Sequence, residues 1–133
     1  MTPSQTQPWN RGDIYMATLP KLSGSIQHGS RPVLILQNNI GNKYAPTIIV
    51  APITSQNKRD ADSNKPSMPT HVQLANNSLI AYKPKFYWRL WSSVIVIEQI
   101  MTLDKVMLTE RIGKTDVLPD MEAAIMVALG MEG

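Results

Sequence analysis

Three polar residues lie at the ends of apolar runs in this sequence, where a rigid strand can hold a side chain over a groove. Arg31 is at the start of one run, Thr54 is at the end of a second, and Glu98 lies near the end of a third. Guanidinium, hydroxyl and carboxylate groups can stabilise charge, donate hydrogen bonds and transfer protons. The same residues also fit ordinary surface positions, so the pattern alone leaves both interpretations open.

Catalysis by a bound metal ion has little support in the sequence. His28 and His71 are the only histidines, neither has a partner at ligand spacing, and the chain contains no cysteine. The phosphate-binding, dinucleotide-binding and nucleophile-elbow motifs are absent as well. We therefore predict no metal and no cofactor.

The length of 133 residues suits one compact domain, which we expect to span residues 11–133 after a flexible leader at residues 1–10. Hydrophobic residues make up 43% of the chain and charged residues 17%, a composition typical of globular proteins. The chain lacks cysteine, a signal peptide and any apolar stretch long enough to span a membrane. We therefore expect a cytoplasmic protein without a membrane partner.

The charge is distributed unevenly along the chain, although the net charge is only +3. Residues 1–95 carry ten basic against three acidic residues, whereas residues 96–133 carry three basic against seven acidic ones. A basic body with an acidic final segment favours a polyanionic or acidic partner, and chance asymmetry is an equally good explanation on charge alone.

The hydrophobic pattern predicts a mainly β domain with one C-terminal helix. Strands are expected at residues 14–19, 32–37, 47–54, 70–74, 79–82 and 93–100, a helical turn at 102–108, and a helix at 119–130. The pattern does not define the structure of the aromatic segment at 86–91. Because no predicted helix separates consecutive strands, we expect a small antiparallel barrel rather than a parallel sheet.

Several segments, read in order, resemble the MazF/PemK family of toxins. The segments RGDIY at 11–15, GS at 24–25, GSRPVLI at 29–35, QN at 37–38 and GN at 41–42 resemble its first half. The segments TIIVAPITS at 47–55, PTHV at 69–72, SVIVIEQ at 93–99, TLDK at 102–105 and Leu108 resemble its second half. The resemblance covers residues 11 to about 115.

The resemblance implies an SH3-like barrel with a C-terminal helix, a homodimer and a cognate antitoxin. It implies a sequence-specific, ribosome-independent mRNA interferase that cleaves single-stranded RNA without metal and contacts DNA only through the antitoxin. The alternative is a barrel that binds nucleic acid or protein without cleaving, as the CcdB-like gyrase poisons do. A third possibility is a degenerate homologue that only binds an antitoxin.

The resemblance matches Arg31 and Thr54 to the catalytic pair of the family. Cleavage without metal uses the 2′-hydroxyl of the substrate as nucleophile and leaves a 2′,3′-cyclic phosphate and a 5′-hydroxyl. Arg31 can stabilise the added charge and Thr54 can position a phosphate oxygen. A guanidinium is a poor general base, so Glu98 is the candidate helper, with His28 and Arg31 as alternatives and an ion pair as its structural explanation.

Further polar residues are candidate RNA contacts because single-stranded RNA is read by hydrogen bonds to exposed bases. These candidates are Gln27, His28, Ser55, Gln56, Lys58, His71 and Gln99. A structural role is the simpler expectation for His71, and Trp88 and Trp91 fit either base stacking or packing.

Three positions depart from the family pattern. Ile26 replaces a glutamate, and Met101 and Met107 replace arginines that the family places near the dimer or RNA surface. The resemblance therefore leaves RNA preference and dimer contacts undefined. The connection at residues 57–68 also looks longer than in compact members of the family.

Overall fold

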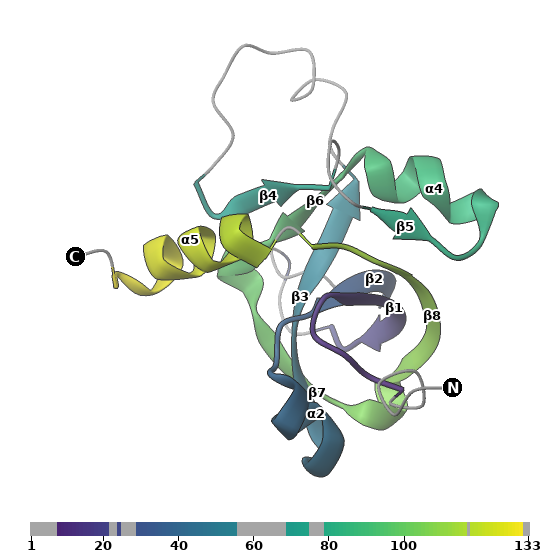
Figure 1. Ribbon diagram of the computed structural model, residues 1–133, viewed down its shortest axis with the longest axis horizontal. Coiled ribbons are helices and arrows are strands. Elements are labelled where there is room, and N and C mark those ends of the chain that lie inside the picture. Colours follow the sequence, from purple (N-terminus) through teal and green to yellow (C-terminus); the bar gives the residue numbers. More distant parts are fainter. Residues whose placement is uncertain are drawn as a thin grey trace.

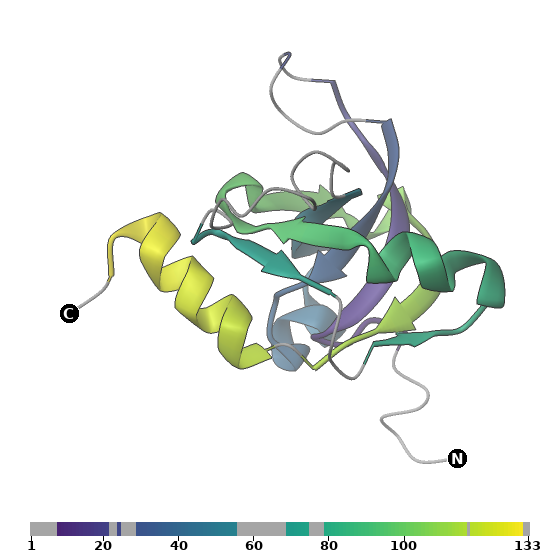
Figure 2. The same ribbon diagram turned by 90° about the horizontal axis from the view of Figure 1, so that it is seen from above.

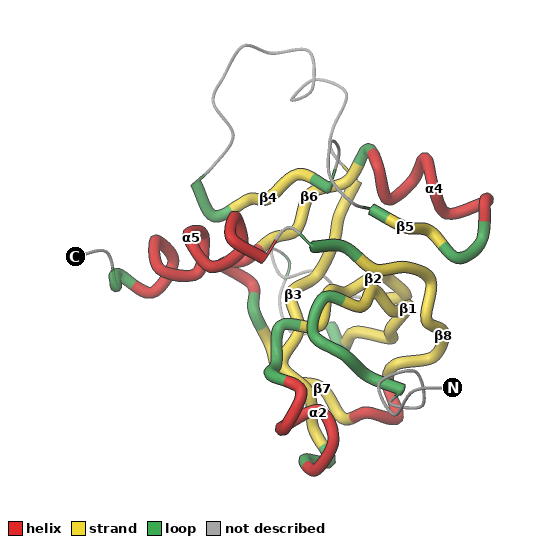
Figure 3. Tube along the Cα trace, in the orientation of Figure 1, coloured by secondary structure: helices red, strands yellow, loops and turns green. Residues whose placement is uncertain are grey.

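The structure is a computed structural model that describes residues 8–21, 24, 29–55, 69–74, 79–116 and 118–131. Within these residues the chain forms an eight-stranded antiparallel sheet, three helices and two 3-10 turns (Figures 1 and 3). No helix in the described part of the chain is long and apolar enough to cross a bilayer.

The strands follow one path across the sheet, from β4 through β6, β3, β2, β1 and β8 to β5, and β7 pairs with the first part of β3. Their bounds are β1 Asp13–Leu19, β2 Gly29–Ile35, β3 Thr47–Ser55, β4 His71–Gln73, β5 Ile80–Ala81, β6 Ser93–Val96, β7 Met101–Asp104 and β8 Leu108–Lys114. The sheet does not close into a barrel, since β4 and β5 form the two ends of the path; Figure 2 shows the molecule from above. The predicted mainly β fold with a C-terminal helix is confirmed, as a partly open barrel.

Alternation along the strands divides the buried side chains between two faces of the sheet. Strand β3 shows this division, because Ile48 and Val50 belong to one core cluster and Ala51 and Ile53 to the other. The cluster of Ile53 is covered by helix α5, Leu118–Leu129, which inserts Met121 into it. This helix matches the predicted one to within a residue at each end.

Two helices interrupt the order of strands, contrary to our expectation. Helix α2, Asn39–Tyr44, lies between β2 and β3, and helix α4, Pro84–Trp91, lies between β5 and β6. Asn38 caps α2 by accepting a hydrogen bond from the Gly41 amide at 2.8 Å. The sequence analysis predicts no helix at this position, because asparagine favours turns as well as helix N-caps.

The two segments after Ser93 also differ from the prediction. Strand β6 ends at Val96, and Glu98 lies in the 3-10 turn η1, Ile97–Gln99, instead of in the strand. The helical turn expected at 102–108 is instead strand β7 followed by the 3-10 turn η2, Lys105–Met107.

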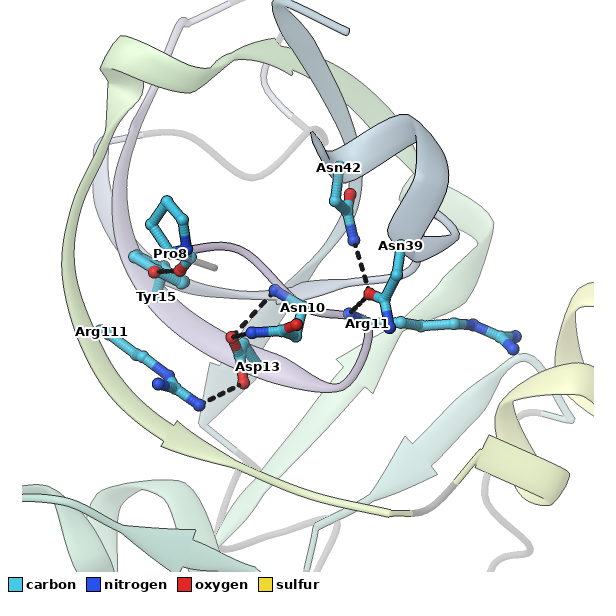
Figure 4. Close-up of polar contacts among 8 residues, drawn as sticks. All are labelled: Pro8, Asn10, Arg11, Asp13, Tyr15, Asn39, Asn42 and Arg111. Atoms are coloured by element: carbon cyan, nitrogen blue, oxygen red, sulfur yellow. Dashed lines mark hydrogen bonds and ion pairs between the residues drawn. The ribbon is translucent and has the colours of Figure 1, made fainter. Parts of the chain in front are cut away.

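The segment from Asn10 to Asp13 joins β1 to the rest of the domain (Figure 4). Asp13 is buried, and its carboxylate accepts hydrogen bonds from the Asn10 amide at 3.0 Å and from Arg111 of β8 at 2.9 Å. Gly12 has a φ of 94°, and a Cβ atom there would lie 2.8 Å from the carbonyl oxygen of Thr115. The Arg-Gly-Asp segment therefore has a structural role.

The last residues of the predicted leader contact the domain. The Tyr15 hydroxyl donates a hydrogen bond to the Pro8 carbonyl, and Trp9 packs against the core cluster of Val50. The Lys105 ammonium lies 4.4 Å from the centre of the Trp9 ring. Residues 1–7 lie outside the described residues, so the leader remains a prediction there.

Candidate active site

Arg31 and Thr54 lie on neighbouring strands and on the same face of the sheet. Strand β2 pairs with β3 through Val33 opposite Pro52. The pairing ends there, and from Ile53 onward β3 pairs with β6. Arg31 and Thr54 each lie two residues beyond this last pair, and residues two apart along a strand point to the same face. Both residues are partly exposed, so a ligand can reach them.

Strand β6 extends this face from Thr54 to β4. Thr54 is opposite Val94, and Val94 is in turn opposite Gln73, so the three residues form one row across the strands. His71 precedes Gln73 by two residues, lies opposite Val96 and therefore belongs to the same face. Val94 and Val96 are buried, whereas Gln73 is exposed. The face thus presents polar groups on either side of an apolar floor.

Glu98 is paired with His71 across the β4–β6 end of the sheet. Its Oε1 atom lies 2.8 Å from Nε2 of His71, and both side chains are partly exposed. Burial acts to raise the pKa of Glu98, but the neighbouring Thr70 hydroxyl and the His71 ring outweigh it, so the pKa lies below its ordinary value. The Thr70 hydroxyl has no hydrogen-bond partner of normal geometry among the described residues, so the contact with His71 is the interaction that holds the Glu98 carboxylate.

This pairing defines which nitrogen of His71 carries the proton. A carboxylate with a lowered pKa is ionised at neutral pH and can only accept hydrogen bonds. Nε2 of His71 is therefore the donor in this contact. The expected structural explanation for Glu98 was a lysine or arginine partner, whereas the side chain that contacts it is a histidine.

The remaining sequence candidates divide into two groups. Ser55 ends β3 as an exposed residue opposite Ser93, and Gln99 is a partly exposed residue of η1. Gln27, His28, Gln56 and Lys58 lie outside the described residues, so their proposed contacts with RNA stay predictions. Trp91 is half-exposed at the end of α4.

Gln73 lies on the same face but was not among the candidates named from the sequence. Its position two residues after His71 gives the two side chains one direction if THVQL forms a strand. Its partner Val94 is 21 residues away in the sequence and Thr54 lies one strand further, so only the pairing of β3, β6 and β4 brings the three into one row.

Met101 and Met107 both pack against the core cluster that contains Val50. Met101 pairs with Val50 at the start of β7, and Met107 ends η2. These methionines therefore fill gaps at the edge of the core, a role that suits a flexible apolar side chain. Ile26, the third departure, lies outside the described residues.

The described residues contain no group of three or more histidines, cysteines or carboxylates that could hold a metal ion. The polar groups of the face described above are instead guanidinium, hydroxyl, amide and imidazole. Such groups can bind a phosphodiester and move a proton without a metal.

Solved structures of other proteins share this fold. The crystal structure of MazF from Deinococcus radiodurans matches with a TM-score of 0.68 at 21% identity, covering 92% of this chain and 96% of that one. A mycobacterial endoribonuclease in complex with its cognate antitoxin matches with a TM-score of 0.66 at 21% identity, covering 93% and 97%. At this identity the likeness shows the fold alone.

Sequence comparison then gives the family. The model of the PemK-like, MazF-like toxins of type II toxin-antitoxin systems matches residues 10–128. The endoribonuclease MazF of Staphylococcus saprophyticus is 41% identical over 123 residues, which cover 91% of each chain. The chain belongs to the family of PemK-like, MazF-like toxins, as its ordered segments predicted.

Proposed function

We propose that this toxin is an endoribonuclease that cleaves single-stranded RNA at short specific sequences, with Arg31 and Thr54 at the scissile phosphate. The observation that carries the proposal is the position of these two partly exposed residues on neighbouring strands, each two residues beyond the pair of Val33 and Pro52. The 41% identity with a protein named as an endoribonuclease supports it. A gyrase poison that leaves RNA intact is not favoured by either finding.

The polar groups of this face match the needs of phosphodiester transfer. The 2′-oxygen attacks the adjacent phosphorus, the new bond forms a cyclic phosphate, and the bond to the 5′-oxygen breaks. Arg31 stabilises the extra negative charge and donates a hydrogen bond to the leaving 5′-oxygen, which takes a proton from solvent as it becomes the 5′-hydroxyl. The Thr54 hydroxyl donates to a phosphate oxygen and fixes its position. No water adds to the phosphorus in this step, and neither a metal nor a cofactor takes part.

We assign the proton abstraction to His71, with Glu98 as a positioning residue. The Glu98 carboxylate is engaged by His71 and its lowered pKa makes it a weak base, whereas Nδ1 of His71 is available. Two strand spacings, about 10 Å, separate β3 from β4. One side chain from each strand, with a ribose phosphate held between them, spans this distance. This assignment replaces Glu98 as the direct base.

Substitution of His71 and of Glu98 tests this assignment. His71→Ala should lower the cleavage rate by about 10²-fold to 10⁴-fold. Glu98→Gln removes the carboxylate that holds Nε2 of His71, so it should slow cleavage by a smaller factor. Rates measured on one RNA would contradict the assignment if both variants cut as fast as wild type.

Glu98 also links pH to stability in a defined direction. Its folded-state pKa is lowered from 4.5, so its contribution is present above that value and is lost as the pH falls through the folded-state pKa. The free energy of unfolding should therefore be lower for Glu98→Gln than for wild type above pH 5. This measurement separates the effect on stability from any loss of catalysis.

The partners expected of such a toxin are single-stranded RNA, a second copy of the chain and a cognate antitoxin in the cytoplasm. The complex of the mycobacterial relative with its antitoxin supports the last of these. DNA is contacted only through the antitoxin.

One experiment tests the nuclease proposal as a whole. The purified protein is incubated in EDTA with a long single-stranded RNA and, separately, with the same RNA in a duplex. We expect cuts at a few sites in the single strand and an intact duplex. An intact single strand in the presence of folded dimer would overturn the proposal.

A further inference from the structure

A hollow of about 460 Å³ lies where β1 begins and β8 ends. Arg111 and Lys114 line it from β8, Thr115 follows that strand, and Tyr82 lines it from the segment after β5. The start of β1 and the residues before it complete the wall.

This hollow is separate from the proposed cleavage face. Arg31 is opposite Ala17 near the end of β1, whereas Asp13 lines the hollow at the start of that strand, four residues or about 13 Å away. None of the catalytic roles assigned above uses a residue that lines the hollow.

The lining carries more positive than negative charge. Three of its side chains are cations, Arg11, Arg111 and Lys114, and Asp13 is the one carboxylate among them. Arg111 pairs with Asp13 at 2.9 Å (Figure 4), and Arg11 pairs with Glu122 at 3.3 Å. The ammonium of Lys114 is exposed and has no ion-pair partner in the part of the chain that the structure describes. The hollow therefore retains a cation for an anionic ligand.

Two hydrogen-bond donors in the wall lack an acceptor. Nε of Arg111 and the hydroxyl of Thr115 are buried and make no hydrogen bond with any residue that the structure describes. Thr115 as a whole is only 6% exposed. A buried donor without an acceptor is costly, and an oxyanion such as phosphate supplies several acceptors at once.

Tyr82 adds a flat aromatic surface beside these donors. Its side chain is 42% exposed, and the guanidinium of Arg111 lies 4.9 Å from the centre of its ring. Nucleobases stack on aromatic rings and on guanidinium planes. Sites for small ligands usually span about 300–1,000 Å³, so the hollow has room for a base and a sugar in addition to a phosphate.

We propose that this hollow binds a mononucleotide, with its phosphate at Arg111 and Lys114 and its base on Tyr82. The phosphate oxygens accept hydrogen bonds from the guanidinium and from the Thr115 hydroxyl, and the Lys114 ammonium balances their charge. Inorganic phosphate shares this chemistry but lacks the base, so it should bind more weakly. The proposal does not depend on the nuclease function.

Calorimetric titrations of the Arg31→Ala protein test the proposal, because this variant lacks the arginine that would hold phosphate at the cleavage face. The titrants are adenosine 5′-monophosphate, inorganic phosphate and adenosine. We expect the mononucleotide to bind about 10-fold more tightly than phosphate, since one base stacked on an aromatic ring contributes a factor of this order. Adenosine should show no measurable binding. Amide NMR signals should shift at Gly12 and Thr115, which line the hollow.

Four variants in the same background locate the site. Lys114→Ala and Thr115→Val should each weaken binding of the mononucleotide by about 10-fold. Tyr82→Leu should reduce the affinity for the mononucleotide to that for phosphate and leave phosphate binding unchanged. Lys21→Ala is the matched control, because it removes an exposed lysine just beyond the other end of β1. It should leave every affinity unchanged.

Two results would contradict the proposal. Unchanged NMR signals around the hollow, or the same affinity for Lys114→Ala, Thr115→Val and Lys21→Ala, would overturn the site. Equal affinity for phosphate and mononucleotide while Tyr82 is intact would overturn the mononucleotide as its ligand.

Discussion

Arg31→Ala should lower the cleavage rate by about 10³-fold or more while the protein remains folded. One preorganised donor at a developing negative charge contributes about 10²-fold to 10³-fold, and Arg31 has two tasks, at the phosphate oxygens and at the leaving oxygen. Arg31 is partly exposed near the start of β2, so its loss leaves no cavity in the core. Initial rates on one defined RNA in EDTA measure the effect.

Arg31→Lys is the matched control for the planar guanidinium. It keeps the charge but loses the paired donors, so we expect a rate between those of wild type and Arg31→Ala. Thr54→Val keeps the shape of the side chain and removes only the hydroxyl. If Arg31→Ala and Thr54→Val, both folded, cut as fast as wild type, the face described above is not the active site.

Asp13→Ala should give the largest loss of stability among single substitutions outside the two cores, about 2–4 kcal/mol. The side chain is only 3% exposed and holds both the Asn10 amide and Arg111. Its removal breaks the link between the N-terminal segment, β1 and β8 and leaves a donor without its acceptor (Figure 4). Urea unfolding followed by tryptophan fluorescence measures the change.

Asp13→Asn separates the hydrogen bonds from the charge. Burial raises the pKa of Asp13, and Arg111 and Asn10 offset this only in part. Its protonated form is therefore favoured by folding, and its contribution to stability falls as the pH rises from 3.8 through the folded-state pKa. Asp13→Asn should cost about 1 kcal/mol at pH 7, and the exposed Asp104→Ala should cost less than about 0.5 kcal/mol. Equal losses for Asp13→Ala and Asp104→Ala would contradict this account.

Local sequence patterns identified the strands that are apolar almost throughout. Strands β2, β3 and β6 were recognised because both of their faces are buried. Strand β8 was missed, because its middle residues Thr109, Glu110 and Arg111 are polar and the strand is only half-buried. Helix α4 was missed because its aromatic residues suit strands as well as helices.

Some residues of the candidate site could be predicted from local sequence motifs, and others could be identified only from the pairing of distant strands. Arg31 and Thr54 could be named from the sequence because the family motifs carry them. The contact between His71 and Glu98 joins residues 27 positions apart and depends on how the end of β6 turns beside β4. Gln73 joins the face only through two successive strand pairings. Pairing of this kind is set by packing across the whole sheet, which no local pattern records.

The chemistry of the cut ends tests the central claim most directly. The wild-type protein is incubated with a single-stranded RNA in EDTA, and both new ends of each fragment are identified by mass spectrometry. The assignment of Arg31 and Thr54 to metal-independent transfer predicts a 2′,3′-cyclic phosphate on one fragment and a 5′-hydroxyl on the other. Cleavage that requires a divalent metal, or that leaves a 5′-phosphate, would contradict it.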